Sequence, residues 1–258
     1  MTKYSIAEIT RINRERREEI KESVKLNKEK IDKIVKDSNS KKIKYPEYKE
    51  AFDYVNSLFP IVGIKNITIY QTSARLLEKV GYAGVGGFYD RISKIIVVSS
   101  SPNFVRNKNK YAIQAKLSED EVIAHELIHY CDVEEKRITS SSNLAEEFAY
   151  GWSIGYLRQK GYTDEQIIKN NFLPYLFQVE HRKVVAKIVD MREYNLYSAK
   201  KKERFYKQYG RRIHKEAKEK AIEQGWILLK LYSDKLEEGI AGRKSTEMGN
   251  RFDLLDLS

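Results

Sequence analysis

The residues best suited to chemistry lie between Ser118 and Asp132, in the stretch SEDEVIAHELIHYCD. Two of the four histidines in the chain, His125 and His129, stand four residues apart, and Glu126 directly follows the first. On an α-helix this spacing puts both imidazoles on one face, where they can reach one cation about 2 Å from each nitrogen. Glu126 lies about 100° further round the helix, where a carboxylate can take a proton from a metal-activated water. The stretch therefore predicts a metal site with a water-activating carboxylate.

The helix that carries these side chains is predicted to be largely enclosed by the rest of the protein. The other faces of this helix carry mainly apolar residues: Val122, Ile123, Leu127, Ile128, Tyr130 and Cys131. Buried imidazoles and carboxylates are unfavourable unless they are paired or bound to a metal. Two core histidines held by hydrogen bonds are the alternative, but they explain neither the four-residue spacing nor the glutamate.

A catalytic zinc site needs a third protein ligand and one open position. No third histidine is close by, since His181 follows His129 by 52 residues. Glu146 and Glu147 instead lie 17 and 18 residues after His129, in the helical stretch SSNLAEEFAYGWSIGYLRQKGY. Glu146 shares a helix face with uncharged residues only, whereas the face of Glu147 ends at Arg158. We expect Glu146 to be the third ligand and keep Glu147 as the alternative.

The pair of motifs HELIH and EEFAYGW resembles the gluzincin branch of the zincin metallopeptidases. The local Glu-x-x-Ala pattern that begins at Glu146 is similar to that of ImmA/IrrE-type peptidases. The resemblance covers roughly residues 60–160. It implies that His125, His129 and Glu146 hold Zn²⁺, and that Glu126 is the general base of peptide-bond hydrolysis.

Two further features bear on the resemblance. Tyr150 stands where many gluzincins place an acid that orients a ligand histidine, and Asp132 is a candidate for that role instead. In zincins a strand just before the active-site helix forms one wall of the cleft and pairs with an extended peptide. The glycine-rich stretch GVGGFYD (84–90) takes this place in the sequence, and its small residues let another backbone approach. Glycines that serve only a local bend are the alternative.

Peptide hydrolysis also needs a group that stabilises the oxyanion formed when water attacks a carbonyl. His181, in the stretch QVEHRK, is our candidate catalytic residue for this step, and Tyr150 and Tyr156 are further candidates. The alternative for the tyrosines is an ordinary packing or surface position, because the chain contains 18 of them.

The elements around these motifs predict an α+β fold, mostly helical with a small sheet. Apolar residues recur at three- and four-residue steps through the first forty residues, which indicates one charged helix. Ser118 followed by Glu121 is a capping box for the HELIH helix, and Thr163 caps a later helix. The other expected elements are a linker over 36–42, a helix from Pro46 to Phe59, a strand over 64–70, a short helix over 74–81, a hairpin over 84–100, a polar connection over 101–116, a helix over 143–160, and helices over 179–237 broken near Asn195 and Gly210.

The basic charge of the chain is concentrated in two segments. The formal net charge is +11. Residues 1–44 carry 14 Lys and Arg against 8 Asp and Glu, and residues 200–220 carry 10 against 3, which leaves about −2 for the remainder. We therefore expect a basic N-terminal helical arm (1–44), a zincin-like domain (45–195) and a basic C-terminal helical extension (196–258).

Composition also restricts the class of protein. Cys131 is the only cysteine, which excludes an intrachain disulfide framework and fits a reducing compartment. The N-terminus has no apolar signal region, and no apolar run approaches the ~18–20 residues that span a bilayer. We expect a cytoplasmic protein, or one carried in a particle assembled in the cytoplasm such as a virion, with no membrane partner.

Together these residues predict a zinc-dependent metallopeptidase that acts on a peptide or protein substrate. The alternative is a structural or assembly protein, for example a phage virion component, whose zincin-like domain has little or no peptidase activity. The basic helical ends are the candidate assembly surfaces. Basic and aromatic residues over 200–220 would also suit nucleic acid, but a solvated helix with its aromatic residues packed on the body is the favoured interpretation.

Overall fold

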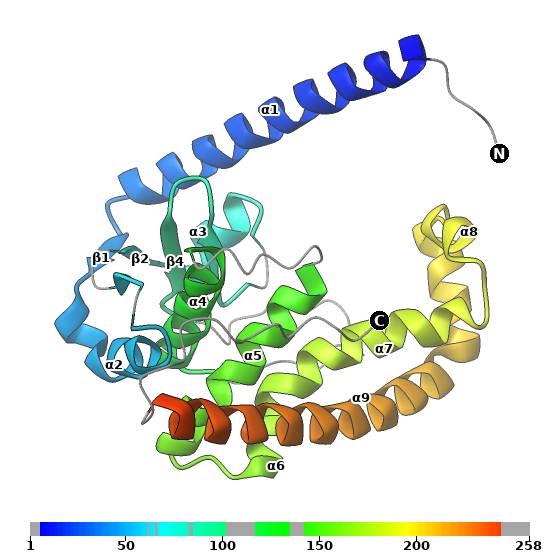
Figure 1. Ribbon diagram of the computed structural model, residues 1–258. Coiled ribbons are helices and arrows are strands. Elements are labelled where there is room, and N and C mark those ends of the chain that lie inside the picture. Colours follow the sequence, from blue (N-terminus) through cyan, green and yellow to red (C-terminus); the bar gives the residue numbers. More distant parts are fainter. Residues whose placement is uncertain are drawn as a thin grey trace.

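The computed structural model describes residues 6–60, 62–64, 67–82, 85–101, 117–134 and 142–243 (Figure 1). Within these residues the chain has the predicted α+β fold, mostly helical with one small sheet. The first half contains α1 (Ile6–Lys36), β1 (Lys41–Ile43), the 3₁₀ turn η1 (Tyr45–Tyr48), α2 (Lys49–Leu58), β2 (Thr68–Thr72), α3 (Ala74–Lys79), β3 (Gly87–Asp90) and β4 (Ile95–Ser99). The second half contains α4 (Glu119–Glu134), α5 (Ser142–Gln159), α6 (Asp164–Ile167), the π-helical turn η3 (Ile168–Phe172), α7 (Leu173–Ala186), α8 (Met191–Asn195) and α9 (Ala199–Arg243).

The four strands form a mixed sheet in the order β1–β2–β4–β3, with β3 at one edge. β2 and β4 run parallel, and β1 and β3 are antiparallel to their neighbours. β-Branched side chains suit a strand buried on both faces, and the middle residues of β4 are fully buried. β3 and β4 form the predicted hairpin, while β2 begins at Thr68 rather than at residue 64.

Helix α4 packs on the sheet through a close contact at Gly87. A Cβ atom at this position would lie 2.5 Å from Cγ1 of Val122 and 3.3 Å from Cγ of Glu126. Both separations are tighter than ordinary contacts between carbon atoms, so a glycine is needed for the helix to come this near to β3. The glycine-rich stretch therefore places the edge strand directly against the helix that carries HELIH.

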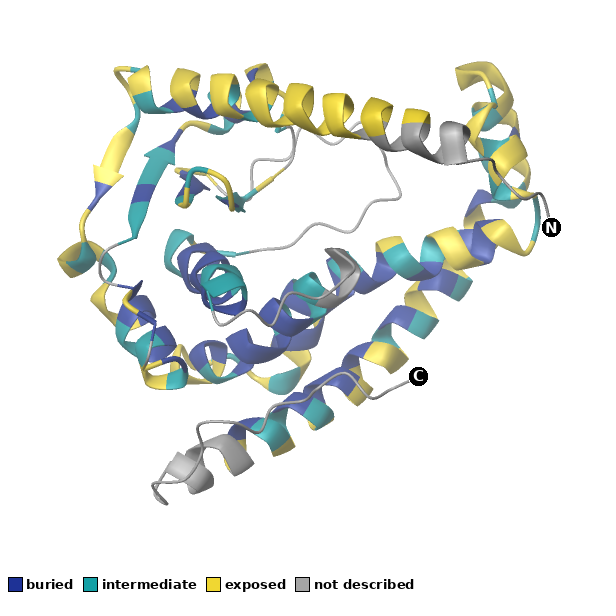
Figure 2. Ribbon diagram, turned by 45° about the horizontal axis from the view of Figure 1, so that its top comes forward, coloured by how far each residue is buried: buried dark blue, intermediate teal, exposed yellow. Residues whose placement is uncertain are grey.

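Helix α4 is enclosed as predicted. The backbone N–H of Ser118 donates to the Glu121 carboxylate at 2.8 Å, which is one half of the expected capping box. Every side chain from Val122 to Ile128 is buried, including the polar His125 and Glu126. In Figure 2 this helix is dark blue along most of its length.

Helices α5, α7 and α9 form the helical side of the molecule. α7 and α9 lie side by side, and α9 also contacts α5 (Figure 1). The predicted break near Asn195 is present between α8 and α9, but the break predicted near Gly210 is wrong because α9 continues through it. Phe205 and Ile213 on either side of Gly210 are buried in the main core, and this packing keeps the helix intact.

Helix α1 confirms the predicted charged helix, but only its last turns join the body. The described side chains upstream are mostly exposed, as the largely yellow helix nearest the N-terminus in Figure 2 shows. Ile31 and Ile34 are buried in a second, smaller core whose other members are Leu77, Val80 and Val97. α1 therefore divides into an attached end and an exposed arm.

Other expectations about chain organisation have different outcomes. The linker predicted over 36–42 is shorter, because Lys41–Ile43 forms β1 and pairs with β2. The domain boundaries near residues 45 and 196 stay predictions, and the apolar face of α9 shares the main core. The polar connection over 101–116, apart from Ser101, and the end of the C-terminal extension after residue 243 lie outside the described residues. None of the described helices is long and apolar enough to cross a membrane.

Candidate metal centre

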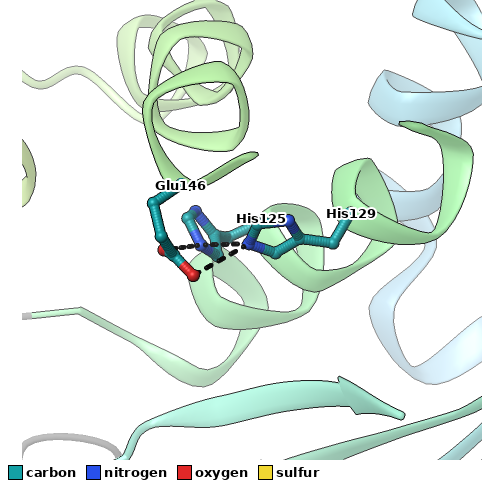
Figure 3. Close-up of side chains that lie close together, drawn as sticks. All are labelled: His125, His129 and Glu146. Atoms are coloured by element: carbon teal, nitrogen blue, oxygen red, sulfur yellow. Dashed lines mark hydrogen bonds and ion pairs between the residues drawn. The ribbon is translucent and has the colours of Figure 1, made fainter. Parts of the chain in front are cut away.

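His125, His129 and Glu146 converge on one point between α4 and α5 (Figure 3). The two Nε2 atoms of the histidines lie 3.2 Å apart. Oxygens of Glu146 lie 3.3 Å from Nε2 of His125 and 3.4 Å from Nε2 of His129. Two atoms bound at about 2.0–2.1 Å to a tetrahedral ion are about 3.3–3.4 Å apart, which is close to the separation of the two Nε2 atoms. Oε2 of Glu146 is the oxygen near His125 and Oε1 is the oxygen near His129, and one ligand atom from each of the three residues lies within 4.8 Å of the others. The three side chains are therefore close enough together to hold one metal ion.

The packing of α5 explains why Glu146, and not Glu147, reaches the histidines. Glu146 shares its face of α5 with three buried residues, Ala149, Ser153 and Leu157. Because that face packs into the core against α4, the Glu146 carboxylate points at the HELIH motif. Glu147 lies instead near Lys235 of α9, and burial raises the pKa of this glutamate although the lysine opposes the effect. The structure thus brings Glu146, and not Glu147, to the two histidines.

The pKa values of Glu146 and of His129 depend on the contact between these side chains. Burial alone would raise the pKa of Glu146, but hydrogen bonds from His125 and His129 outweigh burial and hold that pKa far below its ordinary value of 4.5. Burial alone would lower the pKa of His129, but the hydrogen bond to Glu146 and the nearby carboxylates raise it. The carboxylate is therefore ionised and ready to serve as a ligand.

Glu126 is buried beside this cluster, on the side of the edge strand. Burial raises the pKa of Glu126, and the charges of His129 and His125 oppose the effect. The backbone N–H of Tyr89 in β3 donates a hydrogen bond to the Glu126 carboxylate. A carboxyl group with a raised pKa is suited to accepting a proton and then releasing it.

Asp132 and Tyr150, the two residues discussed in connection with orienting a ligand histidine, both lie near the histidines. Asp132 is buried, and its negative charge helps to raise the pKa of His129. The ring of Tyr150 lies against the ring of His125, with centroids 4.5 Å apart. Both side chains therefore belong to the surroundings of the candidate ligands.

His181 and Tyr156 are not among the residues brought to the site. His181 packs against Phe177 and Tyr206 between α7 and α9, and burial together with His214 lowers the pKa of His181. The Tyr156 hydroxyl donates to Asp120 at 2.7 Å, near the start of α4. Both side chains make packing contacts, which was the alternative to an oxyanion role.

Two further aromatic residues lie near the site and were not predicted from the sequence. The rings of Tyr175 and Phe172 lie 5.6 Å and 6.3 Å from the ring of Tyr150. Burial raises the pKa of Tyr175 to about 12, and the charges of Glu147 and Glu146 add to the effect. The two aromatic residues follow Tyr150 by 25 and 22 positions, and the π-helical turn that precedes α7 has no clear sequence signature. Only tertiary packing brings them here.

The three ligands consist of two imidazole nitrogens and one carboxylate oxygen, which transition metals accept. Among the described residues, no other group of three or more His, Cys, Asp or Glu side chains converges in this way. No protein-family model matches the sequence, and no curated protein and no solved structure shows significant similarity to it. The resemblance to gluzincins thus depends on the two sequence motifs alone.

Proposed function

We propose that the protein is a zinc-dependent metallopeptidase of the gluzincin type that its motifs resemble. The observation that carries the proposal is a group of three side chains, His125, His129 and Glu146, whose ligand atoms lie within 4.8 Å of one another, with Glu126 buried beside them. Two histidines and a glutamate are the protein ligands of catalytic zinc in several peptidases. The side chain of Glu146 is 41% exposed, so water and a substrate can approach the remaining ligand position.

The residues around the site support this reaction. A bound zinc ion would supply Lewis acidity toward a water molecule and toward the substrate carbonyl. Glu126 is placed to accept a proton from the water, and its raised pKa suits later delivery of that proton to the leaving amine. Because Tyr89 of the edge strand donates to Glu126, an extended peptide added to β3 would lie beside the general base.

Replacement of Glu126 tests the proposed chemistry. We expect the wild-type chain to bind about one zinc ion tightly and to cleave members of a random peptide pool until a chelator removes the metal. Glu126→Gln keeps the size of the side chain but removes the base, so it should retain zinc and lose cleavage. A His125→Ala/His129→Ala double variant should bind no zinc, and metal retained there would contradict the site. A zinc-loaded wild type that cleaves no peptide would contradict the peptidase.

The exposed part of α1 favours a second candidate, an assembly role. Its apolar side chains Ile20, Val24 and Leu26 are 54%, 36% and 51% exposed, which is unusual for a helix that stays in solvent. Size-exclusion chromatography with light scattering at several protein concentrations tests this role. Concentration-dependent association that Glu126→Gln leaves unchanged would support assembly, whereas a monomer at all concentrations would contradict self-assembly.

A further inference from the structure

The second ring nitrogen of His125 is unusual for a candidate metal ligand. Its Nε2 atom faces Glu146 and His129, and its Nδ1 atom is buried without a hydrogen-bond partner in the described part of the chain. A histidine that binds a metal usually donates its other N–H to a carboxylate, a carbonyl or water, and this bond fixes the ring. Within the described part of the chain, the orientation of this imidazole therefore depends on contacts other than a hydrogen bond to Nδ1.

Tyr150 is the side chain in the right place. Its ring centroid lies 4.5 Å from that of His125, with the two planes inclined by 49°. Tyr150 is in turn stacked on Tyr175, at 5.6 Å and 29°, and lies 6.3 Å from Phe172. The rings form a row that runs from the start of α7 through α5 to the histidine on α4.

We propose that Tyr150 is a positioning residue, which holds the His125 imidazole by ring packing in place of a hydrogen bond to Nδ1. The inference depends on the proposed metal site and adds the means by which one ligand is oriented. Rings in contact resist rotation of either partner, and such pairs prefer tilted or offset arrangements like the one observed. Because the packing surface is the ring, the Tyr150 hydroxyl is not needed for this role.

A series of variants can separate the role of the Tyr150 ring from the role of its hydroxyl. Tyr150→Phe keeps the ring, and Tyr150→Leu keeps apolar bulk but removes the ring. Tyr175→Leu removes the ring that supports Tyr150 without touching the histidine. Phe148→Leu is a matched control on the same helix, since its ring is buried and packs against Phe59 and Trp152 rather than against the histidines.

The readouts are zinc affinity, from competition with a chromophoric chelator, and the visible absorption spectrum of the cobalt-substituted protein. We expect Tyr150→Phe to match the wild type in both. Tyr150→Leu should weaken zinc binding by about 10- to 100-fold, as for other residues that orient ligands, and should alter the cobalt spectrum. Tyr175→Leu should have a smaller effect in the same direction, and Phe148→Leu should lower thermal stability without changing affinity or spectrum.

Three results would overturn the inference. Wild-type affinity and spectrum in Tyr150→Leu would show that the ring holds nothing. An equal loss in Tyr150→Phe would assign the role to the hydroxyl. A wild type that binds no metal would overturn the proposed function as well as this inference, whereas the first two results would overturn this inference alone. The two failures can therefore be distinguished. If Tyr150→Leu does not fold, Tyr175→Leu decides the question, and wild-type metal binding in that variant would overturn the positioning role.

Discussion

Glu146 and Glu147 are adjacent residues with different surroundings, and this difference can be tested directly. Glu146 lies 3.3 and 3.4 Å from two imidazole nitrogens, whereas Glu147 is half-buried near Lys235 of α9. Glu146→Ala should therefore weaken zinc binding by more than about 100-fold, beyond the loss typical of residues that only orient ligands. Glu147→Ala is the matched control and should leave affinity unchanged. Chelator competition measures both, and equal losses would contradict the ligand assignment.

At this scale the sequence was informative wherever the relevant geometry is local. One turn of helix fixes the relation of His125, Glu126 and His129, so five residues were enough to predict it. The preference for Glu146 depended on which face of α5 is uncharged, which is a weaker but still local signal. The contact between Tyr150 and His125 could not be predicted, because it depends on how α5 meets α4 and on the packing of α7 behind them.

At the scale of elements, the relative position of α4 and α5 is fixed at one end by Asp120. Its carboxylate accepts hydrogen bonds from Tyr156 at 2.7 Å and from Lys160 at 2.6 Å, both on or just after α5. Burial alone would raise the pKa of Asp120, but hydrogen bonds from Lys160, Ser118 and Tyr156 outweigh it and lower the pKa below 3.8. This interaction joins the two helices that carry the candidate metal ligands.

The lowered pKa predicts how stability depends on pH. Because the folded state holds Asp120 ionised more strongly than the unfolded chain does, its contribution is fully present above pH 3.8. The contribution is lost as the pH falls through the folded-state pKa. Asp120→Asn should therefore be less stable than the wild type near neutral pH, and the difference should shrink in acid. Urea denaturation at several pH values measures this, and a difference that grows in acid would contradict the assignment.

At some element boundaries, tertiary packing or strand pairing outweighed the local sequence signal. Gly210 predicted an interruption because glycine weakens a helix by about 1 kcal/mol relative to alanine. Buried neighbours in α9, such as Phe205 and Ile213, stabilise the helix by packing in the main core, and this exceeds the local preference. β1 was assigned to a linker because three polar-flanked residues carry little strand signal, and its existence depends on pairing with β2.

At the scale of the whole molecule, the two basic ends of the chain differ in how they are attached. The basic part of α9 lies on a helix whose apolar face is buried with α5 and α7. Its aromatic residues Phe205, Tyr206 and Tyr209 pack on each other or on the body, which supports the interpretation that they do not stack nucleic-acid bases. The described side chains of α1 instead meet the body near the end of the helix, from Asn27 to Ile34.

This difference predicts that most of α1 can be removed without loss of the fold. The first interactions of α1 with the body along the described chain are at Asn27, which accepts a hydrogen bond from Tyr82 at 3.2 Å, and at Lys30, which lies over the ring of the same tyrosine. Deletion of residues 1–24 leaves these interactions and the second core in place. We expect the truncated protein to unfold at nearly the wild-type temperature and to bind metal with unchanged affinity.

Ile34→Ala is the variant to compare with the truncation, because Ile34 is 0% exposed and lies in the second core. Its loss should lower the free energy of unfolding by about 2–5 kcal/mol, as for other large-to-small core substitutions. Urea denaturation compares the two variants. If the truncation destabilised the protein as much as Ile34→Ala does, the exposed arm would have to make stabilising contacts along its length, and a free α1 would be wrong. If only association seen by light scattering is lost on truncation, α1 serves assembly while the body alone carries the metal site.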